Sequence, residues 1–173
     1  LGHDGINGGA TYYGGHGSGN TTWGPIMGGP GSRKVKTWSN GDYFNANNQQ
    51  DDLERIATLN GFSYRADDHG NTFAVATPLE IDSSTELSGF GIIQQNHDVD
   101  LFSFETAAGN VSFDINPYVA HPNLDVWAGI YDSTGSLIAQ SNPSNNVSAS
   151  FSDVAVAAGK YFLKIDGVGT HGS

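Results

Sequence analysis

The hydrophobic pattern of this chain changes near Asp67, and this change restricts the possible folds more than any other feature. Beyond it, apolar and polar residues alternate with a period of two, as in NVSFDIN and KYFLKIDG, and turn sequences such as AAGN and AAGK separate these stretches. Short alternating segments with regular turns and no helical pattern predict an antiparallel β-sandwich. LDVWAGIY, the turn DSTG and SLIAQ together predict a hairpin. We expect one alternating set of side chains to be buried: Val111, Phe113, Ile115, Leu163 and Ile165.

The first part of the chain has no such period. Twelve of the 24 glycines lie in residues 1–31, which is typical of an irregular loop held by specific contacts. One helix is expected, beginning near Asn47 or Asn48, with Asp51 and Asp52 in its first turn and a stop at Asn60-Gly61. Its apolar face contains Leu53, Ile56, Ala57 and Leu59.

The charge is as uneven as the pattern. Residues 1–65 carry five basic and five acidic residues, whereas residues 66–173 carry two basic and thirteen acidic residues. This step predicts two modules, 1–65 and 66–173. The net charge of −11 argues against nucleic acid as a partner, and no apolar run is long enough to span a membrane.

The residues available for chemistry exclude several enzyme classes. The chain has no cysteine, no G-x-S-x-G sequence and no G-x-x-x-x-G-K-[ST] loop. Thiol and serine hydrolases of those types and phosphate-cradling loops therefore have no support. Nothing in the sequence fixes a pair of glycosidase carboxylates at the required separation either.

The opening sequence LGHDG raises a different possibility. Met27, the only methionine, lies 24 residues after His3 within WGPIMGG, so Leu1 is not an initiator and we expect a piece of a longer chain. Taken alone, His3 is also typical of an ordinary loop histidine. Together with the helix that follows, GHDG and PIM resemble the end of a metzincin zinc site, H-E-x-x-H-x-x-G-x-x-H and a Met-turn, in its reprolysin (adamalysin) branch.

This resemblance implies roles for particular residues. His3 would be the third zinc ligand, Met27 the Met-turn methionine, and residues 1–65 the C-terminal remnant of a catalytic domain. The first two histidines and the catalytic glutamate would precede Leu1, so no catalytic residue is assigned in this chain. Gly28 and Gly29 follow Met27, so the tyrosine ligand of astacins and serralysins is missing.

A second resemblance covers residues 67–173. DDHGNTFAVATPL, DVDLFSF, NLDVWAGIYDSTGSLIA and AGKYFLKIDGVG resemble a bacterial pre-peptidase C-terminal (PPC) domain. Such domains are β-sandwiches attached behind secreted proteases. The resemblance implies a mainly β fold, an antiparallel sandwich of jelly-roll type, and one further strand beyond GVGT.

Two acidic pairs suggest a second metal. Asp67 and Asp68 lie at the junction of the modules, and Asp98 and Asp100 precede an expected strand. Hard cations such as Ca²⁺ prefer several carboxylate and carbonyl oxygens, so the pairs predict a calcium site. The resemblance supports it, since related PPC domains of collagenases hold calcium between linker and strand. Ordinary solvated turns are the alternative, and Asp125 is a weaker candidate.

The other histidines and the tryptophans are expected to have structural roles. We interpret His69, His97 and His121 as loop residues, and Trp23 and Trp38 as packing residues. For His16 we favour a flexible-loop histidine, with a second metal ligand as the alternative.

Two functions fit the sequence. The first is a fragment of a secreted, extracellular zinc endopeptidase, inactive by itself, whose parent hydrolyses proteins or peptides. The second is a non-catalytic β-sandwich that binds an extracellular polymer or self-associates, with Trp127 and Tyr118 as candidate contacts.

Overall fold

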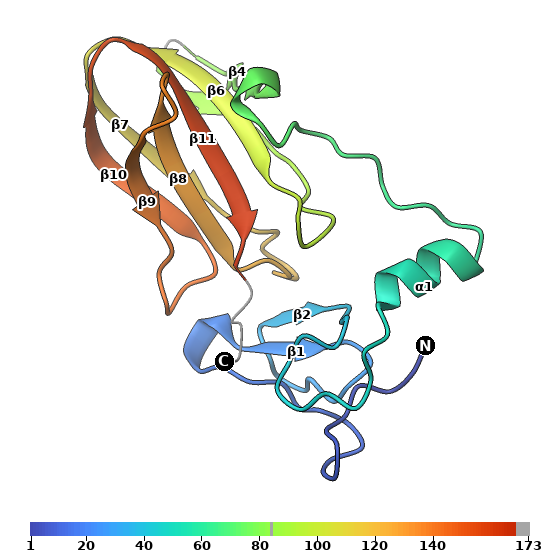
Figure 1. Ribbon diagram of the computed structural model, residues 1–173. Coiled ribbons are helices and arrows are strands. Elements are labelled where there is room, and N and C mark those ends of the chain that lie inside the picture. Colours follow the sequence, from blue (N-terminus) through green and yellow to red (C-terminus); the bar gives the residue numbers. More distant parts are fainter. Residues whose placement is uncertain (84, 169–173) are drawn as a thin grey trace.

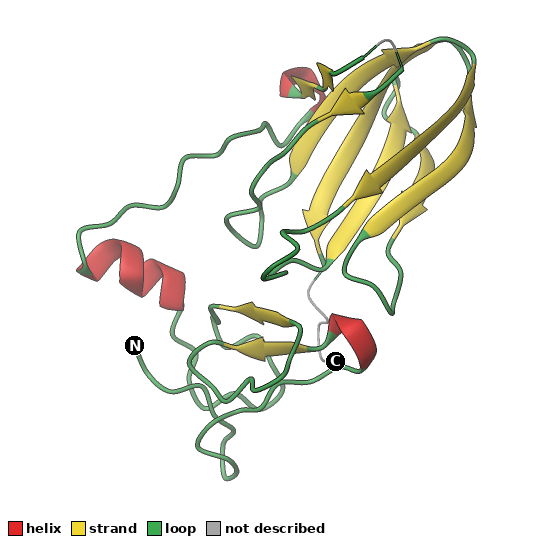
Figure 2. Ribbon diagram, turned by 180° about the vertical axis from the view of Figure 1, so that it is seen from behind, coloured by secondary structure: helices red, strands yellow, loops and turns green. Residues whose placement is uncertain are grey.

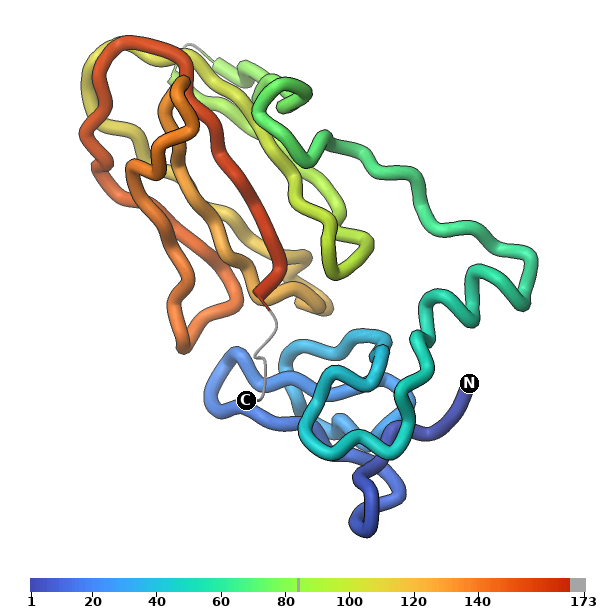
Figure 3. The backbone as a smooth tube through the Cα atoms, in the orientation of Figure 1, coloured from blue at the N-terminus to red at the C-terminus, as the bar shows by residue number. Residues whose placement is uncertain are grey.

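The computed structural model describes residues 1–83 and 85–168, and it is mainly β, with 35% of residues in strands and 8% in helices. This confirms the predicted mainly β class. Figure 1 shows a loop-rich first part and a larger β-part, joined by an extended segment after the only labelled α-helix. The path of that segment is clearest in the tube of Figure 3.

The first part contains more regular structure than predicted. It has a 3-10 turn, η1 (Gly19–Thr21), and two short strands, β1 (Trp23–Pro25) and β2 (Val35–Thr37), which pair in parallel. Much of its backbone is held by side chains. Asn47 accepts a hydrogen bond from the Gly5 amide at 2.8 Å, and the Tyr43 hydroxyl donates to the Gly5 carbonyl at 2.9 Å.

The predicted helix is present but starts later than expected. Helix α1 spans Asp52–Leu59, and Asp51 is its N-cap, accepting a hydrogen bond from the Glu54 amide at 2.9 Å. The predicted start near Asn47 or Asn48 is wrong because the Asn48 side chain accepts from the Gln50 amide, which favours a turn over a helix. The predicted stop is confirmed, since Asn60 is the C-cap and Gly61 has a φ of +71°.

The β-part is built on a five-stranded sheet (Figure 2). Its order is β3-β6-β11-β8-β9, where β3 and β6 are parallel and the other neighbours are antiparallel. The predicted hairpin is β8–β9, closed by the turn at Asp132–Ser136. The strands are β3 (Thr77–Pro78), β6 (Asp100–Thr106), β8 (Val126–Asp132), β9 (Leu137–Ser141) and β11 (Gly159–Gly167).

A second layer covers the inner face of this sheet. It contains an antiparallel pair, β7 (Gly109–Ile115) with β10 (Ala149–Val156), and a separate antiparallel ribbon, β4 (Glu80–Ile81) with β5 (Leu87–Ser88). A 3-10 turn, η2 (Phe73–Val75), leads from the extended segment after α1, called the linker below, into β3. The two layers enclose one hydrophobic cluster, which includes Phe102, Phe104, Val126, Ile130, Phe151 and Leu163.

The predicted core residues are buried to different degrees. Leu163, on the central strand β11, is 3% exposed. Val111, Phe113, Ile115 and Ile165 pack against the cluster but are only partly buried. For Val111, Phe113 and Ile115 the difference follows from the strand, since β7 is paired on one side only. Ile165 lies on the same central strand as Leu163 but near its end, which is Gly167.

Candidate functional site

The His3 segment lies against the turn that contains Met27. The Asp4 amide donates to the Met27 carbonyl at 3.1 Å, and the Gly28 amide closes the turn onto the Pro25 carbonyl at 3.0 Å. The His3 side chain is exposed, and its ring lies 4.7 Å from the Tyr12 ring. The two residues that the sequence singled out are therefore joined through backbone contacts, with one imidazole open to solvent.

Two fully buried carboxylates lie behind this segment. Asp4 accepts a hydrogen bond from the Asn48 side chain at 3.2 Å, and Asp52 accepts from the Ser39 amide at 3.3 Å. One oxygen of each carboxylate has no hydrogen bond. Burial raises the pKa of both, and the charge of Asp52 adds to the rise in the pKa of Asp4. Sequence reasoning missed this pair, because acidic residues 48 positions apart give no local signal.

An aromatic cluster packs beside the buried carboxylates. Tyr13 stacks on Tyr43 at 4.5 Å, its hydroxyl lies 2.9 Å from Nδ1 of His16, and His16 contacts Trp23 at 5.2 Å. Burial raises the pKa of Tyr43 to about 12, with a further contribution from Asp4. His16 lies outside the named helices and strands, as expected, and this cluster and a backbone bridge to Trp23 hold it in place. Trp23 packs as predicted, whereas Trp38 is 36% exposed.

The four aspartates proposed for calcium lie together in the structure. Carboxylate oxygens of Asp67, Asp98 and Asp100 lie within 4.8 Å of one another. Asp68 and Asp100 form a second group of the same size with a nitrogen of His69. The two groups share Asp100, so all four predicted residues and one additional histidine surround the start of β6.

Backbone contacts explain how the linker reaches this point. The Leu101 amide donates to the Gly70 carbonyl at 3.3 Å, and the Val99 amide donates to the Asn71 side chain at 2.9 Å. The loop before β6 closes the other side, because the Gln94 amide donates to Asp98 at 3.0 Å. Gly91 is required there: a Cβ at this position would overlap the Asp100 carboxylate.

The electrostatics of the cluster are unfavourable without a cation. Asp98 and Asp100 are 3% and 2% exposed, and one oxygen of each has no hydrogen bond. Burial raises the pKa of Asp100 to about 6, although His69 opposes the rise, and burial also raises the pKa of Asp98. The sequence has no lysine or arginine from residue 66 to 159 that would balance these charges.

His69 has a larger role than the sequence indicated. One ring nitrogen lies 2.9 Å from the Thr77 hydroxyl and the other lies 2.7 Å from the Phe90 carbonyl. The ring also packs on Phe102 at 4.5 Å. His69 lies in a loop, as predicted, and its contacts in addition tie the linker to β3, to β6 and to the segment after β5. His97 and His121 are exposed, as expected of loop histidines.

Asp125 lies apart from the cluster. It is 8% exposed, and one of its oxygens has no hydrogen bond. Burial alone raises its pKa to about 6. Among the described residues it belongs to no group of three possible metal ligands, so the structure does not bring it to the predicted calcium site.

Comparisons with known proteins add no assignment: no protein-family model, curated protein or solved structure matches the chain. Within residues 1–83 and 85–168, no helix has the length and apolar character needed to cross a membrane.

Proposed function

We propose that this chain is the C-terminal part of a secreted zinc endopeptidase of the metzincin type, followed by a PPC-like, jelly-roll β-sandwich over residues 66–173. The observation that supports the protease part most strongly is the hydrogen bond from the Asp4 amide to the Met27 carbonyl, at 3.1 Å. It joins the segment of the third histidine to the Met-turn, the two features on which the resemblance rests. The buried Asp4 side chain accepts a hydrogen bond from the Asn48 side chain, which also fixes that segment.

His3 by itself is not a sufficient zinc site. A catalytic zinc needs three protein ligands, and no group of three among the described residues includes His3. In this proposal, two histidines and the glutamate base belong to a longer parent chain. Zinc there would supply an acidified water for peptide hydrolysis. The role of this chain is to offer one exposed imidazole, beside the Tyr12 ring, on a segment fixed to the Met27 turn.

Zinc content tests this proposal. In a parent chain that contains H-E-x-x-H, His3→Ala should lower bound zinc and abolish cleavage of casein, whereas His121→Ala, at an exposed histidine of the β-part, should change neither. The 173-residue chain alone should be inactive with or without zinc. Unchanged zinc content in His3→Ala, or zinc-dependent cleavage by the short chain, would contradict the proposal.

We propose in addition that the β-part holds one Ca²⁺ between Asp67, Asp68, Asp98 and Asp100. Support comes from the two buried carboxylate oxygens without a hydrogen bond, on Asp98 and Asp100. The sequence also offers no lysine or arginine between residues 66 and 159 to balance the cluster. Calcium prefers six to eight oxygen ligands in a flexible arrangement, and carboxylates are its usual protein donors. The cation would tie the linker to the first residue of β6.

Calorimetric titration tests the calcium proposal. We expect one Ca²⁺ per chain in the wild type and a loss of at least about tenfold in affinity in Asp98→Asn, because a buried ligand charge is removed. Asp153→Asn is the matched control: it removes one exposed acid on β10 and should leave the affinity unchanged. Equal affinity in Asp98→Asn and wild type would place the cation elsewhere.

The outer face of the five-stranded sheet favours a second candidate function, non-catalytic binding of an extracellular polymer. The Lys164 ammonium lies 5.6 Å from the Trp127 ring, and the Lys160 ammonium lies 5.3 Å from the Phe162 ring. Phe162 is buried and Lys164 also pairs with Asp166 at 3.6 Å, so the Trp127 ring is the part of this face that suits stacking on a polymer chain. Depletion of the protein onto an insoluble polysaccharide, lost in Trp127→Ala and independent of zinc, would favour this function over the first.

A further inference from the structure

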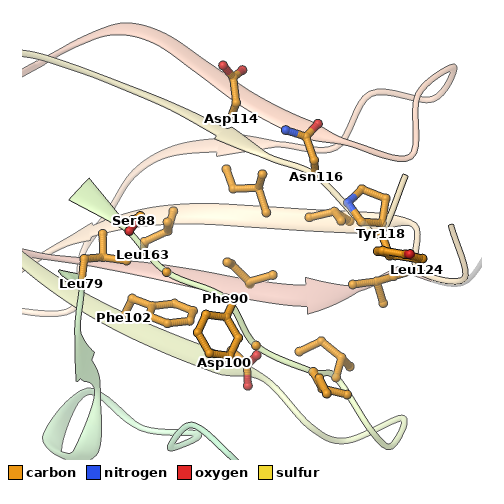
Figure 4. Close-up of a pocket in the computed structure, with 18 of the residues that line it drawn as sticks. Leu79, Ser88, Phe90, Asp100, Phe102, Asp114, Asn116, Tyr118, Leu124 and Leu163 are labelled. Atoms are coloured by element: carbon orange, nitrogen blue, oxygen red, sulfur yellow. The ribbon is translucent and has the colours of Figure 1, made fainter. Parts of the chain in front are cut away.

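A groove in the second layer of the β-part is left open by the strand order. It has a volume of about 810 Å³ and runs between β7 and the β4–β5 ribbon. Figure 4 shows Asp114 and Asn116 on one side, and Ser88 and Phe90 on the other. The bottom of the groove consists of core side chains, including Phe102, Val126 and Leu163.

The wall formed by β7 is an unpaired sheet edge. β7 pairs with β10, and among the described residues no strand pairs with its other edge. An open edge presents backbone N–H and C=O groups to any extended chain that approaches it. Ile115, which is only partly buried, lines the groove next to Asp114. The groove therefore has the form of a site for one strand.

The acidic residues around the groove favour a basic ligand over a second copy of this acidic chain. Asp114 is exposed on β7, and Glu80 and Glu86 are exposed on and beside the ribbon. The two lysines of the β-part lie instead on β11, over the Phe162 and Trp127 rings. A second copy of this chain, paired edge to edge through β7, would bring like charges together, which destabilises cross-strand pairs. A basic strand would complement the same edge.

We propose that this groove binds an extended peptide of another protein, with apolar residues alternating with lysine or arginine, as a strand added to β7. Alternate side chains of a strand point to opposite faces. The apolar set would point into the groove, toward the floor that includes Leu163 and Phe102, and the basic set would lie outward beside Asp114. Phe90 and Tyr118, which are 82% and 73% exposed at the mouth of the groove, would pack on the bound peptide. Main-chain hydrogen bonds supply affinity in this mode of recognition, and the side-chain pattern supplies specificity.

The test uses a synthetic peptide of about nine residues, Lys-Val-Lys-Val-Thr-Val-Lys-Val-Lys, long enough at roughly 3.3 Å per residue to follow β7. It is titrated into the 173-residue chain and followed by amide chemical shifts in NMR spectra. We expect one-to-one binding with shift changes confined to residues 87–90 and 109–118. Replacing lysine by glutamate in the peptide should weaken binding at least about tenfold, and proline at the central position should abolish it because ladder hydrogen bonds are lost.

Two surface variants test the site itself. Asp114→Lys should weaken binding of the basic peptide by about fivefold, since an exposed attractive charge becomes repulsive. Glu105→Lys reverses an exposed charge at the far end of β6 and should leave binding unchanged. Both positions are exposed, so both variants are expected to fold, and their NMR spectra verify this.

Four results would overturn the proposal. The first is no binding by the wild type, and the second is equal binding of the glutamate peptide. The third is a set of shift changes centred on Trp127, on the outer face of the other sheet. The fourth is a peptide-free dimer in sedimentation that Asp114→Lys strengthens, since a second copy would then be the occupant.

Discussion

The two parts of this molecule are held together by different interactions. In residues 1–65 three hydrophobic residues are buried, Val35, Tyr43 and Ala46, and the buried polar residues there include Asp4, Asp52, Ser39 and Thr21. In the described residues after 65, eleven hydrophobic residues are buried, and nine of them form one cluster. The first part depends on specific polar contacts, such as Asn47 to the Gly5 amide, whereas the second depends on a core between two layers.

The difference in apolar burial predicts a difference in stability between the two parts. Apolar burial is the main favourable term in folding, so the β-part has the means to fold alone and the first part does not. Both parts keep carboxylates out of water: Asp4 and Asp52 lie close to the exposed His3 in the first part, and Asp98, Asp100 and Asp125 are buried in the β-part. Perturbed, buried carboxylates are typical of functional sites, although structural networks also contain them.

Separating the two parts should have the largest effect. We expect residues 66–173, produced alone, to retain strand circular dichroism and one cooperative thermal transition in calcium. Residues 1–65 alone should show no cooperative transition, because their small apolar core does not offset the loss of chain entropy. A sharp transition in the isolated first part would break the comparison.

A core substitution in the β-part should have the next largest effect. Ile130 is fully buried on β8, so Ile130→Ala should lower the free energy of unfolding of the β-part by about 3 kcal/mol. Val35→Ala removes a buried side chain from the first part and should leave this transition unchanged. Urea unfolding followed by amide signals of β8 and β11 measures both. A loss of similar size in the two variants would mean that the parts unfold as one unit.

The strands of the β-part were largely predictable because period two reflects their structure directly. The alternation in residues 110–116 and 160–167 corresponds to β7 and β11, and the DSTG turn corresponds to the β8–β9 hairpin. The β1–β2 pair gave no signal, since strands of three residues are too short to show a period and β1 also contains glycine and proline. The groove was not predictable from the sequence either, because the alternation of apolar and polar residues does not indicate which edge of β7 remains unpaired.

The candidate site was predictable where its residues are close in sequence. Asp98 and Asp100 are two positions apart, which places both on one side of the start of a strand. His69 was missed because its contact with the Phe90 carbonyl joins residues 21 positions apart. The Asp4–Asp52 pair was missed for the same reason, as it arises only when α1 packs near the His3 segment.

Two buried carboxylates of the β-part should make its stability fall as pH rises when calcium is removed. The pKa of Asp100 and of Asp125 is raised to about 6, so each acid binds its proton more tightly in the folded state. Their contribution is complete below the unfolded pKa, near 3.9, and is lost as pH rises through about 6, by about 3 kcal/mol each. In chelator, Asp100→Asn and Asp125→Asn should each lose less stability than wild type between pH 4 and 7. Curves parallel to wild type would show that these groups are solvated in solution.

Thermal unfolding with and without calcium tests the central claim, that the acidic cluster at the start of β6 is a cation site. A ligand bound only by the folded state stabilises it by about 2.7 kcal/mol at a hundredfold excess over Kd. We expect the melting temperature of the wild type at pH 7.5 to rise from chelator to millimolar calcium, that of Asp125→Asn to rise equally, and that of Asp100→Ala to stay constant. A wild type indifferent to calcium would mean that these carboxylates form no site. An equal response in Asp100→Ala would mean that calcium binds elsewhere.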